Sequence, residues 1–227
     1  ILHTADWHLG QTFYEYDRRE EHFHFLEWLK QQIKQHEIDV LLIAGDVFDS
    51  PNPSAESQRV YYRFLREVTS ENPSLQIVII AGNHDSAARL EAPNPLLEDM
   101  NIIVRGTVRR NAEGDIDLQH FIVPLYTEGK VTAYCLAVPY LRQGDYPSAE
   151  NYSKGVQQLY EQLFNKVKEK GIPVVAMGHL QATGSEISED DRSERTVIGG
   201  LECVSPDAFN EAITYTALGH LHRSQRV

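Results

Sequence analysis

Five short polar segments hold most of the side chains that could do chemistry, and each follows an apolar run. They carry carboxylate, imidazole and amide groups and span residues 6–8, 45–49, 82–85, 178–179 and 219–222. Such groups bind divalent cations of the hard and borderline type. Strand ends meet at one rim of a sheet, so groups that are distant in the chain can converge there. The pattern therefore predicts a two-metal hydrolase.

The spacing within the segments favours ligands that share a cation. Asp6 and His8 lie two residues apart, and in an extended backbone such side chains point to the same side. His220 and His222 have the same spacing, and Asp46 has two oxygens that could bridge two ions. The seven predicted metal ligands are Asp6, His8, Asp46, Asn83, His179, His220 and His222. Because the set mixes nitrogen and oxygen without cysteine, it favours manganese, iron or zinc over calcium.

Two further side chains are predicted to serve the reaction rather than hold metal. Two ions about 3.5–4 Å apart can activate a water molecule and neutralise an attacked phosphate. His84, beside the predicted ligand Asn83, could protonate or stabilise the leaving oxygen. Asp85 could orient the His84 imidazole. The predicted catalytic residues are therefore His84 and Asp85.

A simpler interpretation exists for each segment taken alone. A single Gly-Asp pair is usually a turn, and a single histidine after a strand is usually an ordinary polar residue. Five such segments in one chain favour a metal site. Two interpretations of Asp49 remain. It could support the ligands or face the substrate, or it could be merely a polar residue. The histidines outside the segments are predicted to be surface or core residues: His3, His22, His24, His36 and His120.

Strand and helix patterns alternate around the polar segments. Predicted strands span residues 1–5, 39–44, 76–81, 101–104, 121–123, 131–138, 172–177, 196–198 and 213–218, with one more around Val108. Predicted helices span residues 17–36, 55–69, 86–90, 95–100 and 153–170, and residues 181–195 form an acidic loop. Apolar strands between amphipathic helices predict an α/β fold, with a mixed and largely covered sheet and helices on both faces.

Length and composition limit the class of protein. The chain has 227 residues and is 41% hydrophobic, which suits one large α/β domain, residues 1–227. Its apolar runs are much shorter than the ~20 residues of a membrane helix, so no membrane association is expected. Two isolated cysteines indicate a reducing cytoplasm rather than a disulfide framework. The chain opens on Ile1 and its last residues do not look like a natural end, so we expect a fragment of a longer protein.

The charge balance bears on possible substrates. The net charge is −12 at pH 7, which counts against capture of nucleic acid by a wide basic face. Two bound divalent ions would add about +4 at the site itself. Basic residues could also lie elsewhere in a longer protein or on a partner.

The five segments resemble the pattern of the calcineurin-like metallophosphoesterase superfamily. That pattern is D-x-H, G-D-x-x-[DN], G-N-H-[DE], G-H and G-H-x-H, and residues 1–222 contain each part of it in order. The resemblance implies a metallophosphoesterase-type layered sandwich, with mixed β-sheets flanked by helices.

Residues 2–10, 44–49, 81–86 and 217–223 are more similar to the nuclease components of DNA-repair complexes within this superfamily. This resemblance implies a manganese-dependent nuclease that trims double-stranded DNA from 3′ ends and cuts single strands and hairpins, in DNA repair, recombination and replication. It implies one ion on Asp6, His8, Asp46 and His222, and a second on Asp46, Asn83, His179 and His220. It also makes His84 the catalytic histidine.

The same resemblance implies partners. Family members usually form homodimers and bind an SMC-like ABC ATPase that controls access of DNA. Their chains continue into a DNA-capping region and ATPase-docking helices, which we expect to be missing from residues 1–227. Archaeal relatives often have histidine where Asp49 stands, whereas bacterial ones resemble this chain.

Two other functions compete with the nuclease. One is an enzyme of the same fold that acts on small phosphoesters, which the acidic charge favours slightly. The other is a scaffold that kept the fold and lost catalysis, which the complete ligand set and His84 disfavour.

Overall fold

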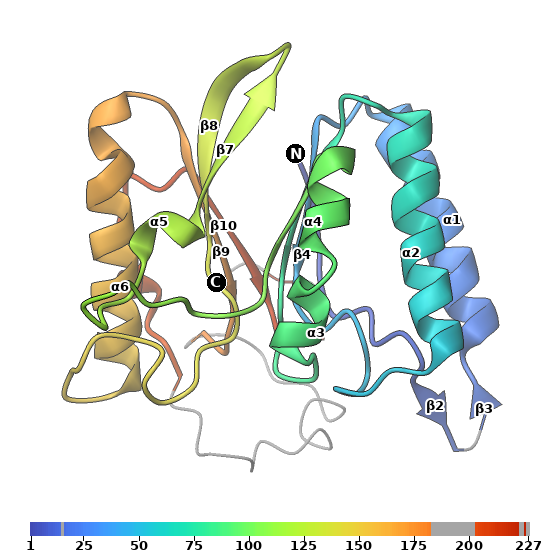
Figure 1. The fold of residues 1–227 in the computed structure, drawn as a ribbon, viewed down its shortest axis with the longest axis horizontal. Coiled ribbons are helices and arrows are strands. Elements are labelled where there is room, and N and C mark those ends of the chain that lie inside the picture. Colours follow the sequence, from blue (N-terminus) through green and yellow to red (C-terminus); the bar gives the residue numbers. More distant parts are fainter. Residues whose placement is uncertain (15, 183–202, 223–224, 226–227) are drawn as a thin grey trace.

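Two four-stranded sheets pack face to face, and helices cover the outer face of each (Figure 1). The computed structural model describes residues 1–14, 16–182, 203–222 and 225. The layers run helix, sheet, sheet, helix, so the chain is an α/β sandwich, as predicted.

The first sheet is parallel throughout and has the order β1-β4-β5-β6. Its strands are β1 (Leu2–Thr4), β4 (Val40–Ala44), β5 (Gln76–Ile80) and β6 (Ile102–Arg105). Its outer face packs against α1 (Arg19–Gln35), α2 (Ala55–Glu71), α3 (Ala87–Glu91) and α4 (Asn94–Leu97), which η1 (Glu98–Met100) follows. Ser54 caps the N-terminus of α2, where its side chain accepts a hydrogen bond from the Ser57 backbone amide.

The second sheet is mixed and has the order β10-β9-β8-β7. An antiparallel pair, β7 (Ile122–Thr127) and β8 (Lys130–Ala137), joins the parallel strands β9 (Val174–His179) and β10 (Tyr215–Gly219). Its outer face is covered mainly by α6 (Tyr152–Val167). Shorter helices flank it: α5 (Leu118–Phe121), η2 (Lys168–Lys170) and η3 (Pro206–Ala208).

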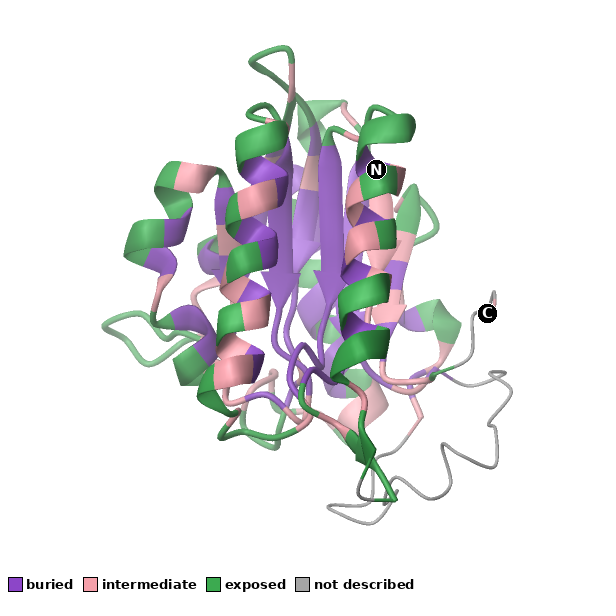
Figure 2. Ribbon diagram, turned by 90° about the vertical axis from the view of Figure 1, so that its right-hand side faces the viewer, coloured by how far each residue is buried: buried purple, intermediate pink, exposed green. Residues whose placement is uncertain are grey.

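Each central strand is apolar on both faces because it separates two cores. In β4, Leu41 and Ile43 pack against the helices, whereas Leu42 and Ala44 pack against the second sheet. Figure 2 shows the strands almost wholly in the colour for buried residues. The rim at their carboxyl ends is therefore built on a rigid base.

The structure differs from several sequence predictions. The strand and helix pattern alone predicted one covered sheet, whereas the family resemblance implied more than one, and there are two four-stranded sheets. The pattern could not show this, because a strand buried on both faces has the same apolar residues against a helix or against another sheet. Val108 lies in no strand, and only an isolated bridge joins Arg110 to Ile116 nearby. The strand 196–198 and nearly all of the acidic loop 181–195 lie outside the described residues.

Two short helices and one hairpin were not predicted. The helices are α5 and η3, and the hairpin consists of β2 (Thr12–Phe13) and β3 (Tyr16–Asp17) and projects beside the rim (Figure 1). Among the described residues, no helix has both the length and the apolar composition that crossing a membrane requires.

Candidate metal centre

The seven predicted ligands come together at the carboxyl-terminal rim of both sheets. Asp6 follows β1, Asp46 follows β4, and Asn83 follows β5. From the second sheet, His179 ends β9 and the segment with His220 and His222 follows β10. Because β1, β4, β5, β9 and β10 end at one rim, residues more than 200 positions apart become neighbours.

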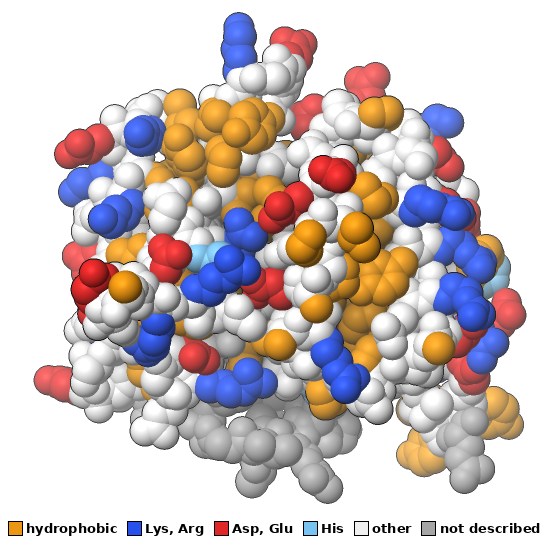
Figure 3. All heavy atoms as spheres, in the orientation of Figure 1, with side chains coloured by type: hydrophobic (Ala, Val, Ile, Leu, Met, Phe, Trp, Pro, Cys, Tyr) orange, Lys and Arg blue, Asp and Glu red, His pale blue; other side chains and the backbone are white. Residues whose placement is uncertain are grey.

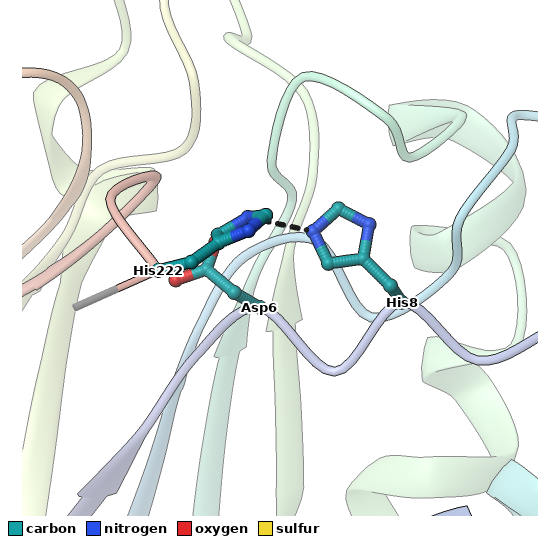
Figure 4. Close-up of side chains that lie close together, drawn as sticks. All are labelled: Asp6, His8 and His222. Atoms are coloured by element: carbon teal, nitrogen blue, oxygen red, sulfur yellow. Dashed lines mark hydrogen bonds between the residues drawn. The ribbon is translucent and has the colours of Figure 1, made fainter. Parts of the chain in front are cut away.

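One half of the cluster consists of Asp6, His8 and His222 (Figure 4). Their ligand atoms all lie within 4.8 Å of one another, and Nε2 of His8 is 3.1 Å from Nε2 of His222. Two ligands of one cation are roughly 3 Å apart when each is ~2.1 Å from it. The backbone amide of His220 donates to both carboxylate oxygens of Asp6, at 3.0 and 3.2 Å, which fixes this carboxylate.

The other half consists of Asn83, His179 and His220. Oδ1 of Asn83 lies 3.0 Å from Nε2 of His179 and 3.0 Å from Nδ1 of His220. Oδ2 of Asp46 lies 3.2 Å from Nε2 of His179 and 3.8 Å from Nε2 of His8. Asp46 therefore contacts both halves, as a bridging ligand must.

A neighbouring acceptor fixes how the His179 imidazole points. Its Nδ1 lies 2.8 Å from the carbonyl oxygen of Ala44, and this hydrogen bond holds the proton on Nδ1 and leaves the Nε2 lone pair for a metal. Nδ1 of His8 lies 3.3 Å from a carboxylate oxygen of Asp49, which is an ion-pair distance without hydrogen-bond geometry. Both Nε2 atoms face the centre of the cluster.

The backbone at the ligands adopts conformations that cost energy. Asp6, His8, Asp46 and His220 have φ angles of 56°, 46°, 49° and 95°, in the left-handed region that L-residues rarely adopt. Each such residue costs on the order of 1–3 kcal/mol and persists where its surroundings hold it. Four of the seven predicted ligands have this conformation, which indicates that the loops are shaped for the site.

Glycines allow the loops to approach one another closely. Gly45 has φ of +90°, and a Cβ there would lie 2.3 Å from Nδ1 of His179. A Cβ on Gly82 would lie 2.1 Å from Oδ1 of Asp46. Both distances are impossible for real atoms, so these two positions require glycine.

The electrostatics of the cluster favour a cation. Burial alone would raise the pKa of Asp46 and lower that of His179, but the attraction between their opposite charges outweighs the effect of burial on both pKa values. The pKa of Asp46 falls below its usual range, and that of His179 rises to about 9. Burial raises the pKa of Asp6, whereas burial and then the charge on His179 lower the pKa of His220 to about 4.

These shifts mean that, without a metal, the positive charge of protonated His179 stabilises the buried, ionised carboxylate of Asp46. A divalent cation at the same place would supply that charge and release the proton. The donor types, their separations and the strained loops therefore fit two divalent ions.

Comparison with known proteins agrees with this geometry. The profile of the family described as Calcineurin-like phosphoesterase matches residues 1–224. The chain belongs to the calcineurin-like phosphoesterase family.

Several curated relatives of this phosphoesterase are named as the SbcD component of the nuclease SbcCD. The chain is 42% identical to the protein of Rhodobacter capsulatus over 99% of its own length and 58% of the relative's. It is 32% identical to the Escherichia coli K12 protein over 99% and 56% of the two chains. It is 30% identical to that of Bacillus subtilis over 100% and 58%. The chain thus spans just over half the length of these relatives.

The two predicted catalytic residues of the phosphoesterase occupy different surroundings. The His84 imidazole lies at the rim, and its Nδ1 is 2.9 Å from the carbonyl oxygen of Asp49. Its backbone amide donates to Oδ1 of Asp46 at 2.8 Å, which places it beside the shared carboxylate. The ring is thus held next to both halves of the cluster.

The prediction that Asp85 orients His84 is wrong. The buried Asp85 carboxylate accepts hydrogen bonds from the backbone amides of Gly82, Val47 and Phe48, at 2.9, 3.2 and 3.0 Å. Burial, and then the nearby charge of Asp46, raise the pKa of Asp85. Its role is to tie the loop after β4 to the loop after β5.

Sequence reasoning missed one residue at the rim, Tyr140. Its ring centroid lies 6.2 Å from that of His179, its amide donates to the carbonyl of Ala81, and the Arg142 guanidinium lies 5.4 Å from its ring centroid. Tyr140 follows strand β8, so its place in the chain could have indicated a position at the rim. Its residue type did not indicate a role there, because a phenol is not a typical ligand of the predicted metals.

The remaining histidines lie outside the cluster, as predicted. His24 and His36 are exposed, and His22 and His120 are buried. Nδ1 of His3 lies 2.9 Å from the hydroxyl of Tyr215.

Proposed function

We propose that residues 1–227 form the metallophosphoesterase domain of an SbcD-type nuclease, which hydrolyses DNA phosphodiesters with two divalent ions. The observation that carries this proposal is the Asp46 carboxylate, which lies between two groups of ligand atoms and contacts a histidine of each. The domain would act as a 3′ to 5′ exonuclease on double strands and an endonuclease on single strands and hairpins.

The two ions divide the ligands between them. Asp6, His8, Asp46 and His222 would hold one ion, and Asp46, Asn83, His179 and His220 the other. Imidazole nitrogens mixed with carboxylate and amide oxygens suit Mn²⁺, the ion we expect. When bound, such ions supply a water of lowered pKa and positive charge beside the attacked phosphate.

His84 is the chain's own proton donor in this proposal. Its Nδ1 is held by the Asp49 carbonyl and its backbone by Asp46, so the ring keeps one orientation beside the shared carboxylate. A histidine so placed can give a proton to the leaving oxygen of the cleaved ester, which typically contributes a factor of roughly 10²–10⁴ in rate. Asp85 contributes by fixing the loop that carries His84.

The hairpin β2–β3 supports DNA rather than a small phosphoester as the substrate. Phe13, Tyr14 and Tyr16 are exposed on it, Tyr14 by 84%, only a few residues after the ligand His8. Exposed aromatic rings stack on nucleobases of any sequence, at about 1–3 kcal/mol per base. Such stacking does not need a wide basic face on the protein, so it is compatible with the net charge of −12.

Partners follow from the same proposal. The relatives are named as components of SbcCD, so we propose an SbcC-like SMC/ABC ATPase as a partner, in the cytoplasm and in DNA repair and recombination. We also propose a homodimer. On the face shown in Figure 3, apolar side chains gather between α4 and α2. Leu96 of α4 is 75% exposed, and Tyr62 of α2 is partly exposed.

The test compares two substrates on the purified chain with Mn²⁺. We expect cleavage of a labelled DNA hairpin and of bis(4-nitrophenyl) phosphate, and loss of both with a chelator. Cleavage of the small diester alone, under every metal tried, would favour the small-phosphoester enzyme. Binding of less than one ion per chain would favour the scaffold.

A further inference from the structure

The loop after β8, residues 138–151, lies at the rim next to the second half of the ligand cluster. The Tyr140 amide donates to the carbonyl oxygen of Ala81 at 2.8 Å, which joins this loop to the residue that follows β5. The Tyr140 ring centroid lies 6.2 Å from that of His179, with the ring planes at 76°. Leu141 is buried and packs in the core beside α6. The loop therefore has a fixed place at the rim.

Arg142 extends from this loop, and its backbone is fixed by Asp145. Its amide donates to Oδ2 of Asp145 at 2.8 Å, and its carbonyl oxygen accepts from the Asp145 amide at 2.9 Å. Its exposed guanidinium lies over the Tyr140 ring, 5.4 Å from the centroid. The negative face of an aromatic ring attracts a cation placed in this way. One ring therefore contacts both the guanidinium and the predicted ligand His179.

The Arg142 guanidinium has no carboxylate partner within the described part of the chain. In contrast, Arg18, Arg59 and Arg109 each form an ion pair with a glutamate. The N–H groups around the edge of the Arg142 guanidinium point away from its own centre in a planar fork, and contact with a ring face does not use them. Arg142 is therefore a cation at the rim that can still bind an anion.

We propose that Arg142 binds a DNA phosphate next to the one that is cleaved, while Tyr140 holds the guanidinium in place. This inference rests on the proposed function. The planar fork of a guanidinium matches two oxygens of a phosphate and stays charged at any physiological pH. A strand carries one phosphate for each ~3.4 Å of helix axis, so a phosphate at the ions has close neighbours along the strand. Because the guanidinium is linked to the ligands through the Tyr140 ring, it suits such a neighbour.

The position of Arg142 also indicates the path of the strand. Figure 1 shows the β2–β3 hairpin at the lower right and the loop after β8 at the lower left, with the ends of the central strands between them. The hairpin follows His8 of the first half of the cluster, whereas Arg142 lies near His179 of the second half. A strand that stacks a base on the hairpin and places a phosphate on Arg142 would cross both ion sites.

Two other roles for Arg142 compete with this proposal. It could merely brace the Tyr140 ring, but a brace does not need an exposed cation without a carboxylate partner among the described residues. It could also bind the attacked phosphate itself, and it would then serve every phosphodiester, large or small. The second role predicts the same loss on a small diester as on DNA, which separates it from the proposal.

The experiment measures kcat and KM for a labelled DNA hairpin and for bis(4-nitrophenyl) phosphate, with Mn²⁺, from about 50 to 200 mM KCl. In Arg142→Gln, we expect KM for the hairpin to rise about 5–10-fold, between the effects of an exposed ion pair and a charge-assisted hydrogen bond. The slope of log KM against log salt concentration should fall by about 0.7–0.9, the value for one lost phosphate contact. Kinetics on the small diester, which has no neighbouring phosphate, should not change.

Arg142→Lys keeps the charge but lacks the planar fork. We therefore expect the salt dependence of the wild type and a KM between those of the wild type and Arg142→Gln. Lys130→Gln, which removes one positive charge at the far end of the molecule, is the matched control (Figure 1). It should keep the KM and the salt dependence of the wild type.

A second measurement identifies the phosphate. Each hairpin of a series carries one uncharged methylphosphonate, at successive positions on either side of the cleaved bond. In the wild type, one of these positions should raise KM about 5–10-fold, as the loss of Arg142 does. In Arg142→Gln the same position should have no further effect, because the contact is already lost. Equal effects in both proteins at every position would overturn the proposal.

The remaining outcomes separate the proposal from its competitors. An unchanged KM and an unchanged salt dependence in Arg142→Gln would make Arg142 a brace for Tyr140. Equal loss on the hairpin and the small diester would place it at the attacked phosphate. Loss of Mn²⁺ binding, measured by calorimetry, would make it a support of the metal centre. If the wild type hydrolyses the small diester but no DNA, the proposed function itself is overturned.

Discussion

The Asp46 carboxylate lies 3.2 Å from Nε2 of His179, and these two residues belong to different sheets. Asp46 follows β4 of the first sheet, and His179 ends β9 of the second. The centre therefore exists only when the two sheets pack in one relative position. The apolar core between them, which includes Leu42, Val78 and Met177, sets that position.

Removal of the Asp46 side chain should empty both metal sites. In Asp46→Ala, we expect metal content to fall from two ions to less than one per chain, because the same carboxylate serves both halves of the cluster. Elemental analysis after dialysis against Mn²⁺ measures this. Asp39→Ala, at the other end of the same strand and away from the rim, should keep two ions. One full ion left in Asp46→Ala would show that Asp46 does not bridge.

Removal of the His84 imidazole should separate catalysis from metal binding. In His84→Ala, we expect two bound ions and a fall in kcat of about 10²–10⁴-fold, because a proton donor is lost but no ligand is. Hairpin cleavage and metal content are measured on the same preparation. His24→Ala, on the exposed face of α1, is the control. Loss of an ion in His84→Ala would make His84 a ligand.

Residue type and spacing were sufficient to predict which side chains come together at the rim, because few other uses explain carboxylate, amide and imidazole groups after five apolar runs. They were not sufficient for Asp85. Sequence adjacency suggested His84 as its partner, but the turn at 82–85 directs the carboxylate to backbone amides of another loop. The contact of Asp49 with His8 was equally hidden, because it depends on a ladder between loops about forty residues apart. The strand pattern predicted buried strands but could not tell one sheet from two.

A methyl group at Gly82 should damage the metal centre more than the fold. Its Cβ would lie 2.1 Å from Oδ1 of Asp46, so in Gly82→Ala the bridging carboxylate has to move. We expect Mn²⁺ affinity to fall at least tenfold, measured by calorimetry. Gly171→Ala is the contrasting variant, because Gly171 has φ of +68° and open space around it. It should lose about 1 kcal/mol of stability and keep metal binding.

Protonation of His120 should destabilise the fold in acid. Burial, and then the charge of Arg105, lower the pKa of His120 to about 4, below its value of 6.5 as a free side chain. Between these two pH values the unfolded chain binds the proton and the folded chain does not. Stability should therefore rise with pH from 4 to 6.5, by at most about 1.4 kcal/mol per pH unit from this group.

Urea unfolding of the wild type and His120→Gln across this pH range, with a chelator present, isolates the effect. The difference between their unfolding free energies should depend on pH only below about 6.5. His36→Gln, which removes an exposed histidine, is the control variant. A pH-independent difference for His120→Gln would mean that His120 titrates alike in the folded and unfolded chains.

Loss of the Tyr14 ring should weaken DNA cleavage and spare the small diester. Tyr14 is 84% exposed at the tip of the β2–β3 hairpin, so Tyr14→Ala should leave stability unchanged. Loss of one base stack should raise KM for a DNA hairpin about 5–150-fold, which corresponds to about 1–3 kcal/mol. Hydrolysis of bis(4-nitrophenyl) phosphate should not change, because that substrate has no nucleobase. Tyr126→Ala, in the β7–β8 hairpin at the far end of the molecule, is the control (Figure 1). Equal loss on both substrates would place Tyr14 in the support of His8 instead of on the path of DNA.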